Sequence, residues 1–293
     1  MSFIQNEYLK DSGDEQVTLT LTNPDLELFL DHYDVEDMVY HYGWKFKGHR
    51  GFFDRYVDYW TEQKIKAGKE GNKGQRQIAK LMLNSLYGKF GLSGTCAKKT
   101  PIFHEDGRLG YITEKPEERK TVYIPVAAFT TAYARNKTIR TSQKIREYTE
   151  KKYGVDGYVY SDTDSIKANL TDEDLEYLSR EGILDIDDFR LGAWACEEHF
   201  DRILCIRQKC YITESEGHVG VTVAGLPKYL TPLISFENFK KGFTTAGLSQ
   251  TEMVLMARAN GASDDELEEI HHKTTYKHVD GGVIFVDTEF TIK

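Results

Sequence analysis

The sequence predicts an α+β fold, because helical patterns and hairpin patterns occupy different stretches of the chain. Two runs carry apolar residues at helical spacing, over residues 51–90 and 126–148. Two others place turn formers between β-rich runs, over residues 102–112 and 157–168. Strands joined by a tight turn pair antiparallel, so we expect small antiparallel sheets beside the helices.

Length and composition are those of an ordinary soluble protein. The chain has 293 residues, 40% apolar and 29% charged, which suits one large domain or two to three smaller ones. The net charge of −9 argues against indiscriminate nucleic-acid binding, but it leaves room for a local basic groove. The cysteines at 96, 196, 205 and 210 lack C-x-x-C spacing, and no apolar run resembles a signal peptide or membrane span. We therefore expect reduced thiols in a cytosolic protein without zinc.

The first ninety residues predict one strand and three helices. Residues 17–21 alternate as a strand, and Asn23-Pro24 supplies an N-cap and a first-turn proline for a short helix. A second helix should begin near Gly51 with an aromatic stripe that we expect to pack in the core. A third should span residues 75–90. Its apolar face should carry Ile78, Leu81, Met82 and Leu86.

A basic face lies on the third predicted helix. Its residues recur every three or four positions and combine cations, a carboxamide and an aromatic ring: Lys73, Arg76, Lys80, Asn84 and Tyr87, followed by Gly88. A solvated helix face normally interleaves both signs of charge, whereas this face is basic or neutral. We interpret it as a phosphate-binding stripe, with a solvated face as the alternative.

Two later stretches add further cations. Residues 94–121 predict a protruding hairpin with a turn at 105–107, whose cations could touch a phosphate backbone or face solvent. Residues 126–148 predict a helix on which Thr131, Arg135 and Thr138 share one face. Small residues beside an arginine allow a nucleic-acid backbone to approach closely, and ordinary helix packing is the alternative.

The run Tyr160-Ser161-Asp162-Thr163-Asp164-Ser165 is the strongest candidate for chemistry. It follows a strand at 157–160, and residues 165–168 can pair back as a second strand. Asp162 and Asp164 are two residues apart, so in extended backbone both carboxylates project from one face. Paired carboxylates favour Mg²⁺ or Mn²⁺, which usually reach a protein together with substrate phosphates. The alternative is a turn whose aspartates cap their own backbone.

The region after this turn predicts further strands. A strand over 203–213 places Lys209 and Tyr211 on one face, where they could hold a phosphate or form a cross-strand surface pair. A turn at 215–217 leads to alternating valines at 219–223.

Three stretches of the second half carry weaker signals. The acidic residues 171–190 predict a helical linker. Residues 251–278, which include two adjacent histidines, predict an exposed helix-and-loop excursion and no metal site. Residues 283–285 and 290–292 are typical of closing strands.

Four motifs in order resemble those of the family B DNA polymerases. Residues 80–88 match the K-x-x-x-N-S-x-Y-G signature, and residues 160–165 match Y-x-D-T-D-S. Residues 209–211 match K-x-Y, and Thr131-x-x-x-Arg135 resembles a DNA-contact motif of the protein-primed branch of small tailed phages. The chain end, residues 281–293, together with residues 236–239, resembles the thumb of that branch. The similarity runs over nearly the whole chain and is weakest over residues 250–278.

The resemblance implies template-directed nucleotidyl transfer on primer–template DNA and a dNTP. Two ions, Mg²⁺ or Mn²⁺, would activate the primer 3′-hydroxyl and neutralise the leaving pyrophosphate. Asp162 and Asp164 would bind them. Lys80 would hold the triphosphate and assist the leaving group, with Arg76 and Asn84 nearby.

The same resemblance implies the DNA contacts. Tyr87 and Gly88 would lie at the nascent base pair, and Lys209 and Tyr211 would hold the primer terminus. The residues implied to touch backbone phosphate are Thr131, Arg135 and Lys228.

The fold implied by the resemblance is an incomplete polymerase palm with helical fingers, a β-hairpin insertion and a small β-rich thumb. The expected parts are a partial palm at 1–51, fingers at 52–90, the insertion (a second terminal-protein region) at 91–123, palm at 124–213 and thumb at 214–293. An incomplete palm should expose apolar surface where the absent part would pack.

Two parts of the family pattern are absent from the sequence. The first palm motif, D-x-x-S-L-Y-P, which supplies another metal-binding aspartate, does not occur, and neither does the exonuclease domain. We therefore expect the C-terminal part of a polymerase, inactive alone, that needs an upstream chain for the missing aspartate. Half of a split gene, a prophage remnant and a truncated gene are the origins left open.

Three functions of different class follow. The first is a polymerase fragment that acts with an upstream chain, and with a terminal protein as a further partner. The second is a non-catalytic DNA-binding remnant. The third, an unrelated metal-dependent phosphotransferase, is disfavoured by four ordered motifs. We expect no membrane partner and a cytoplasmic location in a phage-infected or prophage-bearing cell.

Overall fold

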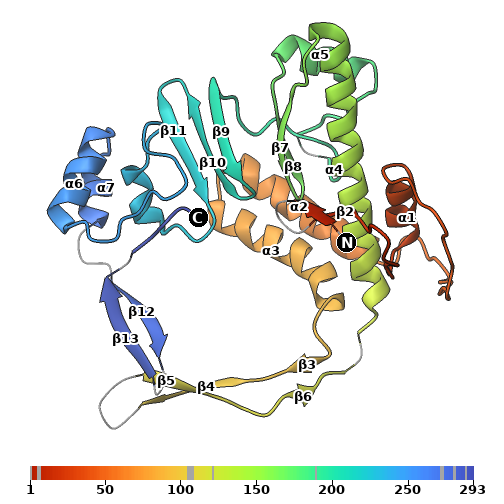
Figure 1. The fold of residues 1–293 in the computed structure, drawn as a ribbon, viewed down its shortest axis with the longest axis horizontal. Helices are drawn as coiled ribbons and strands as arrows, with labels where there is room; N and C mark the ends of the chain where they lie inside the picture. Colours follow the sequence, from red (N-terminus) through yellow and green to blue (C-terminus); the bar gives the residue numbers. More distant parts are fainter. Residues whose placement is uncertain are drawn as a thin grey trace. The chain divides into compact units, whose positions relative to one another are not determined.

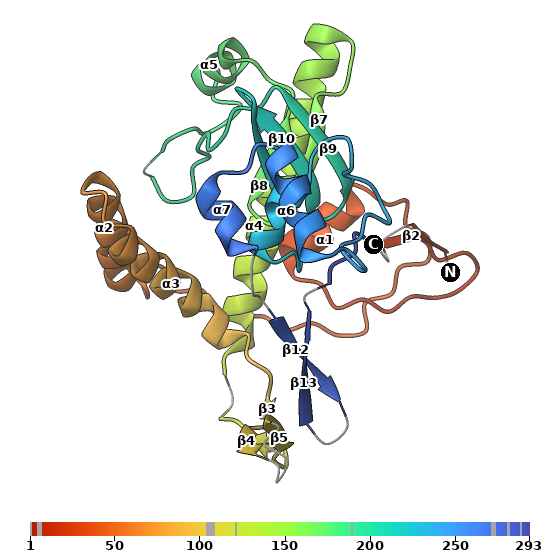
Figure 2. The same ribbon diagram turned by 90° about the vertical axis from the view of Figure 1, so that its left-hand side faces the viewer.

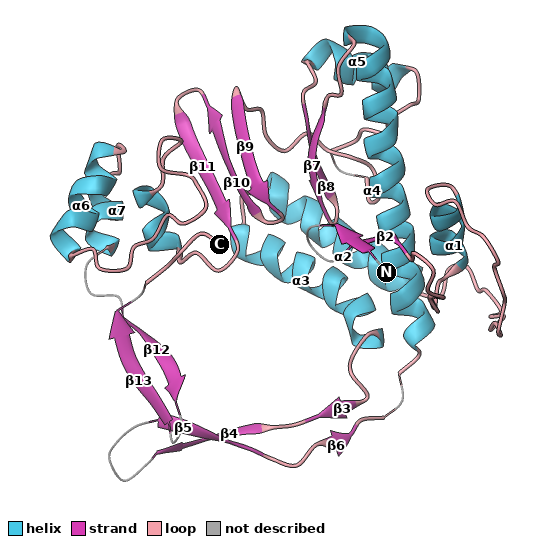
Figure 3. Cartoon of the chain, in the orientation of Figure 1, coloured by secondary structure: helices cyan, strands magenta, loops and turns pink. Residues whose placement is uncertain are grey.

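The computed structural model describes residues 2–4, 8–103, 109–120, 122–188, 190–270, 274–279, 282–287 and 289–293. The chain divides into two compact units. The first comprises residues 1–92, 121–157 and 163–165, and the second comprises residues 93–120, 158–162 and 166–293. The fold is α+β, as predicted, with helices and small antiparallel sheets in different stretches (Figure 1, Figure 3).

The first unit is mainly helical. Its helices are α1 (Asn23–Leu30), α2 (Asp54–Lys69), α3 (Lys73–Phe90) and α4 (Ile124–Tyr153), and a short antiparallel pair, β1 (Ser2–Ile4) and β2 (Tyr8–Asp11), precedes them. Helices α2 and α3 lie side by side and confirm the helical hairpin predicted over 52–90 (Figure 1). Gly71 adopts a φ of 67° in the connection, and the Asn72 side chain caps α3 by accepting from the Gln75 N–H at 3.0 Å.

The core position predicted for the aromatic stripe is wrong: none of Phe52, Phe53, Tyr56 and Trp60 is buried, and Phe52 is 78% exposed. Part of the stripe packs against α3 at the surface of the unit. The Tyr56 hydroxyl donates to the Met82 carbonyl at 3.0 Å, and the Phe53 and Phe90 rings lie 5.7 Å apart.

The apolar face predicted for α3 is correct for Met82 and Leu86, which are half-buried, and wrong for its other two residues. Ile78 and Leu81 are exposed, whereas Ala79 is completely buried, because a small side chain lets the two helices approach closely.

Helix α4 is longer than predicted, and both α1 and α3 pack against it. Pro125 opens its first turn, and Gly154, with a φ of 72°, ends it in a left-handed cap. The N-terminal boundary predicted for α1 is wrong by one residue, since Thr22 is the N-cap. Residues 17–21, predicted as a strand, have no regular structure because no partner strand pairs with them in the described chain.

The second unit contains a three-stranded antiparallel sheet of β9 (Arg202–Arg207), β10 (Cys210–Ser215) and β11 (His218–Val223), in the order β11-β10-β9 (Figure 3). The single strand predicted over 203–213 is therefore wrong. The chain reverses at Gln208-Lys209, where Lys209 adopts a φ of 53°. The turn predicted at 215–217 is confirmed, with Glu216 and Gly217 both at positive φ.

Two apolar clusters hold this unit together. One lies against the sheet and contains Cys210, Ile212, Val223, Ile234, Phe239 and Ile292. The other joins η1 (Lys228–Leu233), α6 (Gln250–Ala259) and α7 (Asp264–Glu269), which pack together (Figure 2). The exposed excursion predicted from residue 251 is wrong as far as residue 270, because Leu267 and Ile270 are buried in this cluster. Residues 271–273 lie outside the described chain. The prediction of helix and loop is also wrong for residues 274–278, which lie in strand β12 (Thr274–Val279).

The remaining elements are short. They are β3 (Thr95–Cys96), β4 (Lys99–Phe103), β5 (Leu109–Thr113), β6 (Glu117–Glu118), β7 (Tyr158–Asp162), β8 (Ser165–Ala168), α5 (Asp172–Arg180), β12 (Thr274–Val279) and β13 (Gly282–Asp287). The pairing of β4 with β5 confirms the predicted hairpin, whose turn at 105–107 lies outside the described residues.

Two predicted boundaries in the second unit are corrected. The helix predicted over 171–190 ends at Arg180, where a turn with Gly182 at a φ of 66° follows. Strand β13 confirms the strand at 283–285, whereas residues 290–292 contribute a single bridge, between Thr244 and Thr291.

Candidate functional site

Strands β7 and β8 form a hairpin (Figure 3), and the two candidate aspartates flank its turn. Asp162 is the last residue of β7, and Asp164 directly precedes β8. Thr163 lies between them with a φ of 54°, in the left-handed region that a β-branched residue rarely adopts. The extended backbone from which a shared face was predicted for the two carboxylates is therefore absent. The left-handed conformation persists only where surrounding contacts stabilise it.

A buried threonine of α4 supplies one of those contacts. The Thr138 hydroxyl donates to the Thr163 carbonyl at 2.9 Å, and the Ala134 carbonyl of its own helix lies at 3.1 Å. The sequence placed Thr138 on a face with Thr131 and Arg135 but gave no hint of this partner, which is 25 residues away. Thr138 thus ties the turn between the two aspartates to the longest helix of the first unit.

The entry to β7 is fixed by a second threonine of α4. The Gly157 N–H donates to Thr149 Oγ1 at 2.8 Å, and Thr149 is completely buried. A Cβ on Gly157 would lie 2.6 Å from Thr149 Cγ2, which is too close for any side chain. Glycine is therefore required at this position.

Lys209, the lysine of the K-x-Y motif, faces the hairpin. Its Nζ lies 3.2 Å from Asp162 Oδ2, and its backbone N–H donates to the Tyr160 hydroxyl at 2.8 Å. Burial raises the pKa of Tyr160, an effect that the hydrogen bond from Lys209 opposes. Lys209 reaches these partners from the β9–β10 turn, so the reason given for placing it beside Tyr211, a shared strand, is wrong. Lys209 and Tyr211 nevertheless both contact Tyr160, since the Tyr211 and Tyr160 rings lie 5.4 Å apart.

The basic stripe of α3 is exposed to solvent along its length. Its members, all on the first unit, are Lys73, Arg76, Lys80, Asn84, Tyr87 and Gly88. Helix α3 packs against neighbouring helices on the side that carries the buried Ala79. The stripe therefore remains available to a ligand. Lys228, at the start of η1 in the second unit, is exposed as well.

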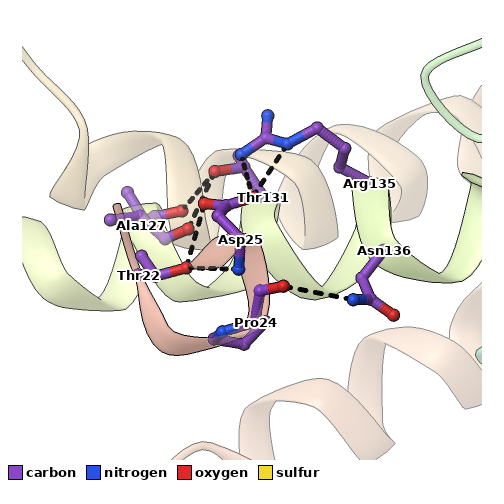
Figure 4. Close-up of polar contacts among 8 residues, drawn as sticks. Thr22, Pro24, Asp25, Ala127, Thr131, Arg135 and Asn136 are labelled. Atoms are coloured by element: carbon purple, nitrogen blue, oxygen red, sulfur yellow. Dashed lines mark hydrogen bonds and ion pairs between the residues drawn. The ribbon is translucent and has the colours of Figure 1, made fainter. Parts of the chain in front are cut away.

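Arg135 and Thr131 are engaged within the protein (Figure 4). Two guanidinium nitrogens of Arg135 donate to Asp25 Oδ1, at 3.0 and 2.8 Å, and the Asp25 side chain is only 13% exposed. The Thr131 hydroxyl donates to carbonyls of its own helix, and the Asn136 amide donates to the Pro24 carbonyl at 3.2 Å. These contacts fasten α1 to α4, so helix packing, the alternative reading of this face, is realised here.

Sequence reasoning missed Asp25. The Thr22 hydroxyl donates to Asp25 Oδ2 at 2.9 Å, and the Asp25 N–H donates to Thr22 Oγ1 at 3.4 Å. The spacing Thr-x-x-Asp before an apolar run is a capping signature that could have singled out Asp25. Its ion pair with Arg135, 110 residues away, leaves no local signal.

No group of three or more histidine, cysteine, aspartate or glutamate side chains suited to a metal ion occurs among the described residues. No helix in the described part of the chain is long and apolar enough to cross a membrane.

Residues 2–179 match the family model for DNA polymerase type B, organellar and viral. The chain belongs to this family. The DNA polymerase of Bacillus phage Nf is 35% identical over 309 residues, which cover 99% of this chain and 46% of that polymerase. The Bacillus phage phi29 enzyme is 35% identical over 306 residues, and that of Streptococcus phage Cp-1 is 32% identical over 293 residues, covering 98% of this chain and 46% and 44% of the relatives.

Solved structures of the phage phi29 DNA polymerase have a similar fold. Its complex with primer–template DNA and incoming nucleotide substrates aligns with a TM-score of 0.74 at 32% identity, over 100% of this chain and 48% of that one. Its complex with single-stranded DNA aligns with a TM-score of 0.68 at 32% identity, again over 100% and 48%. The chain therefore spans about half the length of these type B polymerases and corresponds to the C-terminal part of the phi29 enzyme.

Proposed function

We propose that this chain is the C-terminal part of a DNA-directed DNA polymerase and binds primer–template DNA and a dNTP for template-directed nucleotidyl transfer. Membership of the type B family carries the proposal, together with the paired aspartates at the β7–β8 turn. The whole of this chain aligns with about half of the phi29 polymerase. The structure of that polymerase was solved in complex with primer–template DNA and incoming nucleotide substrates.

The donor atoms at the turn fit a divalent cation. Asp162 and Asp164 supply carboxylate oxygens, and Mg²⁺ is usually held by one or two carboxylates together with substrate phosphates. The Asp162 carboxylate already accepts a cationic partner, Lys209, at 3.2 Å. We infer two ions, Mg²⁺ or Mn²⁺, in the complete site. When bound, they activate the primer 3′-hydroxyl and offset the charge of the leaving pyrophosphate.

The exposed stripe of α3 is proposed to bind the nucleotide. Lys80 holds the triphosphate and can give a proton to the leaving group, while Arg76 and Asn84 fix the phosphates. Tyr87 and Gly88 face the nascent base pair. All five residues are exposed on one helix, which leaves them open to a ligand.

The remaining contacts are proposed for DNA. Lys209 and Tyr211 hold the primer terminus. The Lys209 ammonium, which pairs with Asp162 in this structure, exchanges that partner for a phosphate of the primer. The residues proposed to touch backbone phosphate are Thr131, Arg135 and Lys228. Arg135 keeps more than half of its side chain exposed despite its bond to Asp25, so one edge of the guanidinium can still donate.

We propose that a further carboxylate comes from outside these 293 residues, on an upstream polypeptide that carries the D-x-x-S-L-Y-P motif. Two carboxylates supply few ligands for two metal ions. Among the described residues, no group of three or more acidic, histidine or cysteine side chains suits a metal ion. Largely exposed aromatic side chains at Tyr40, Tyr42 and Trp44 are candidates for covering by such a partner. A terminal protein is a further proposed partner, and the proposed place of action is the cytoplasm of a phage-infected or prophage-bearing cell.

Primer extension with Mg²⁺ tests this function. The chain alone should bind primer–template DNA without extending it, and a mixture with the upstream polypeptide should extend it. Asp164→Asn should abolish extension by the mixture. Absence of DNA binding would refute the proposal, while binding without extension by the mixture would leave a non-catalytic DNA-binding remnant. Brisk extension by the chain alone would show that no outside carboxylate is needed.

A further inference from the structure

A lysine outside the polymerase motifs, Lys167 of β8, is largely buried in the second unit. Its side chain is 15% exposed, and its Nζ lies 2.6 Å from Glu198 Oε2. The other oxygen, Glu198 Oε1, accepts from the Thr213 hydroxyl at 3.0 Å, and Thr213 is buried in β10. Burying an ammonium costs free energy unless a partner compensates its charge, so these three side chains form a connected polar network.

Two aromatic rings complete the surroundings of the ammonium. Lys167 Nζ lies 5.8 Å from the centroid of the Tyr211 ring and 5.6 Å from that of Phe200. Both distances are within the range at which a cation is attracted to an aromatic face. Such attraction weakens as water reaches the cation, and the Lys167 side chain is 15% exposed.

The network leads directly to the primer-terminus residues. The Tyr211 ring lies 5.4 Å from that of Tyr160, whose hydroxyl accepts from the Lys209 N–H. Lys209 in turn reaches Asp162. All of these residues belong to the second unit, so Lys167 connects a partly exposed ion pair, in which the Glu198 side chain is 38% exposed, to the K-x-Y motif within one compact body.

We propose that Lys167 is a positioning residue. Its ammonium, anchored by Glu198 and Thr213, holds the Tyr211 ring in the orientation with which this chain recognises a primer 3′ terminus. The inference rests on the proposed function, because Tyr211 has a primer to hold only if the chain binds primer–template DNA. The competing explanation is a purely structural ion pair that stabilises the sheet without directing Tyr211.

Binding to two DNAs separates these explanations. The full chain and its variants are titrated against a fluorescent template strand, once alone and once annealed to a primer with a recessed 3′ end. The ratio of the two dissociation constants measures recognition of the primer terminus. The variants are Lys167→Met, Lys167→Arg and Glu198→Gln. The control is Arg180→Met, which removes an exposed cation that pairs with Glu181 and lies 5.5 Å from the centroid of the Tyr177 ring, so it too loses a cation–π contact, but not one with Tyr211. Fluorotyrosine at position 211 reports the ring environment by ¹⁹F NMR.

We expect Lys167→Met to lower the preference for the recessed primer about three- to tenfold, since the cation–π contact with Tyr211 is lost, while affinity for the bare template stays within about twofold. Lys167→Arg, which keeps the cation, should retain most of the preference. Glu198→Gln should act in the same direction as Lys167→Met. The ¹⁹F resonance at position 211 should move in Lys167→Met and stay in place in Arg180→Met.

An unchanged preference, or equal weakening on both DNAs with an unmoved ¹⁹F resonance, overturns the proposal in favour of a structural ion pair. If Lys167→Met does not fold, Glu198→Gln decides by the same criteria. A wild-type chain without any preference for the recessed primer refutes the proposed function instead. In that case the ¹⁹F resonance alone decides whether Lys167 directs Tyr211.

Discussion

The side-chain ammonium of Lys209 lies 3.2 Å from a carboxylate oxygen of Asp162. A single positive charge thus lies beside one of the two proposed metal ligands. A divalent cation at the same carboxylate would be repelled by it, although solvent weakens the effect because Lys209 is about half exposed. The lysine and the metal therefore compete for Asp162.

Replacing Lys209 by glutamine should raise the affinity of the chain for Mn²⁺. We expect about threefold tighter binding, a small effect because the removed charge is partly solvated. Water-proton relaxation of Mn²⁺ solutions measures it without any activity assay. Lys241→Gln, on an exposed lysine of the same unit, is the matched control. Equal or weaker Mn²⁺ binding by Lys209→Gln would show that the contact does not compete with metal.

Thr138→Val should loosen the turn between the aspartates. The substitution keeps the shape of the side chain but removes the donor to the Thr163 carbonyl. We expect a loss of about 1 kcal/mol of unfolding free energy, the usual net value of one hydrogen bond, and weaker Mn²⁺ binding as the turn relaxes. Urea denaturation and Mn²⁺ relaxation measure the two effects.

Two companion variants interpret that result. Thr138→Ser keeps the hydroxyl and should retain most of both properties. Thr130→Val removes a hydroxyl that donates to a carbonyl of the same helix, at an exposed site, and should change neither. Equal loss in Thr138→Val and Thr130→Val would mean that the link to Thr163 has no special role.

Gly157→Ala should destabilise the entry to β7. The new Cβ would stand 2.6 Å from Thr149 Cγ2, and Thr149 is completely buried and cannot swing away. Overpacking of this kind costs about 1–3 kcal/mol, to be read from chemical denaturation. Gly43→Ala is the control, because nothing lies within 4 Å of its added Cβ.

A second substitution tests the cause of that loss. Thr149→Ser removes the clashing methyl group, so Gly157→Ala should cost less in its presence than in the wild-type background. Additive losses in the double variant would contradict a steric clash between these two residues.

The sequence predicts an element correctly where contacts between residues close in sequence determine its structure, and it fails where tertiary contacts do. The hairpin over 99–113 and the helices over 54–90 follow from periodicity and turn residues, and both formed as predicted. The reversal at Lys209 went unseen because no glycine, proline or asparagine marks it, and a lysine at positive φ is rare. The exposed Ile78 shows tertiary packing overriding an apolar pattern, since α3 approaches its neighbour through Ala79 instead.

The same distinction between local patterns and tertiary contacts applies to the candidate site. Asp162, Asp164, Lys80 and their neighbours are visible as motifs because they are close in sequence. The contacts from Thr138 to Thr163, from Arg135 to Asp25 and from Lys167 to Glu198 join residues 25, 110 and 31 positions apart. No periodicity encodes such pairs, so only the folded chain brings them together.

The cysteines should react with a thiol reagent in order of burial. Cys196 is exposed and should react first, whereas Cys210 is buried and should react only when the chain unfolds. Burial also raises the pKa of the Cys205 and Cys210 thiols, which lowers their thiolate fraction. Reaction with Ellman's reagent near pH 8 gives the rates, and Cys196→Ser should remove the fast phase. A fast Cys210 would mean that the sheet opens readily.

Glu198 should make stability pH-dependent in the acid range. Burial alone would raise the pKa of its carboxyl, but hydrogen bonds from Lys167 and Thr213 outweigh burial, and the net shift is downward from 4.5. A carboxyl with a lower pKa in the folded state stabilises the protein above its unfolded pKa. That contribution disappears as the pH falls through the folded value, because the unfolded chain then binds the proton more readily.

The wild-type chain should therefore lose stability more steeply than Glu198→Gln as the pH falls from about 5 to about 3. Above that range the difference between the two should stay constant, since the carboxyl is ionised in both folded and unfolded chains. Urea midpoints measured at each pH give both curves. Parallel curves through the acid range would mean that Lys167 and Thr213 do not hold the carboxylate in its charged form. A steeper curve for the glutamine variant would be incompatible with the lowered pKa, because glutamine at this position has no proton to bind.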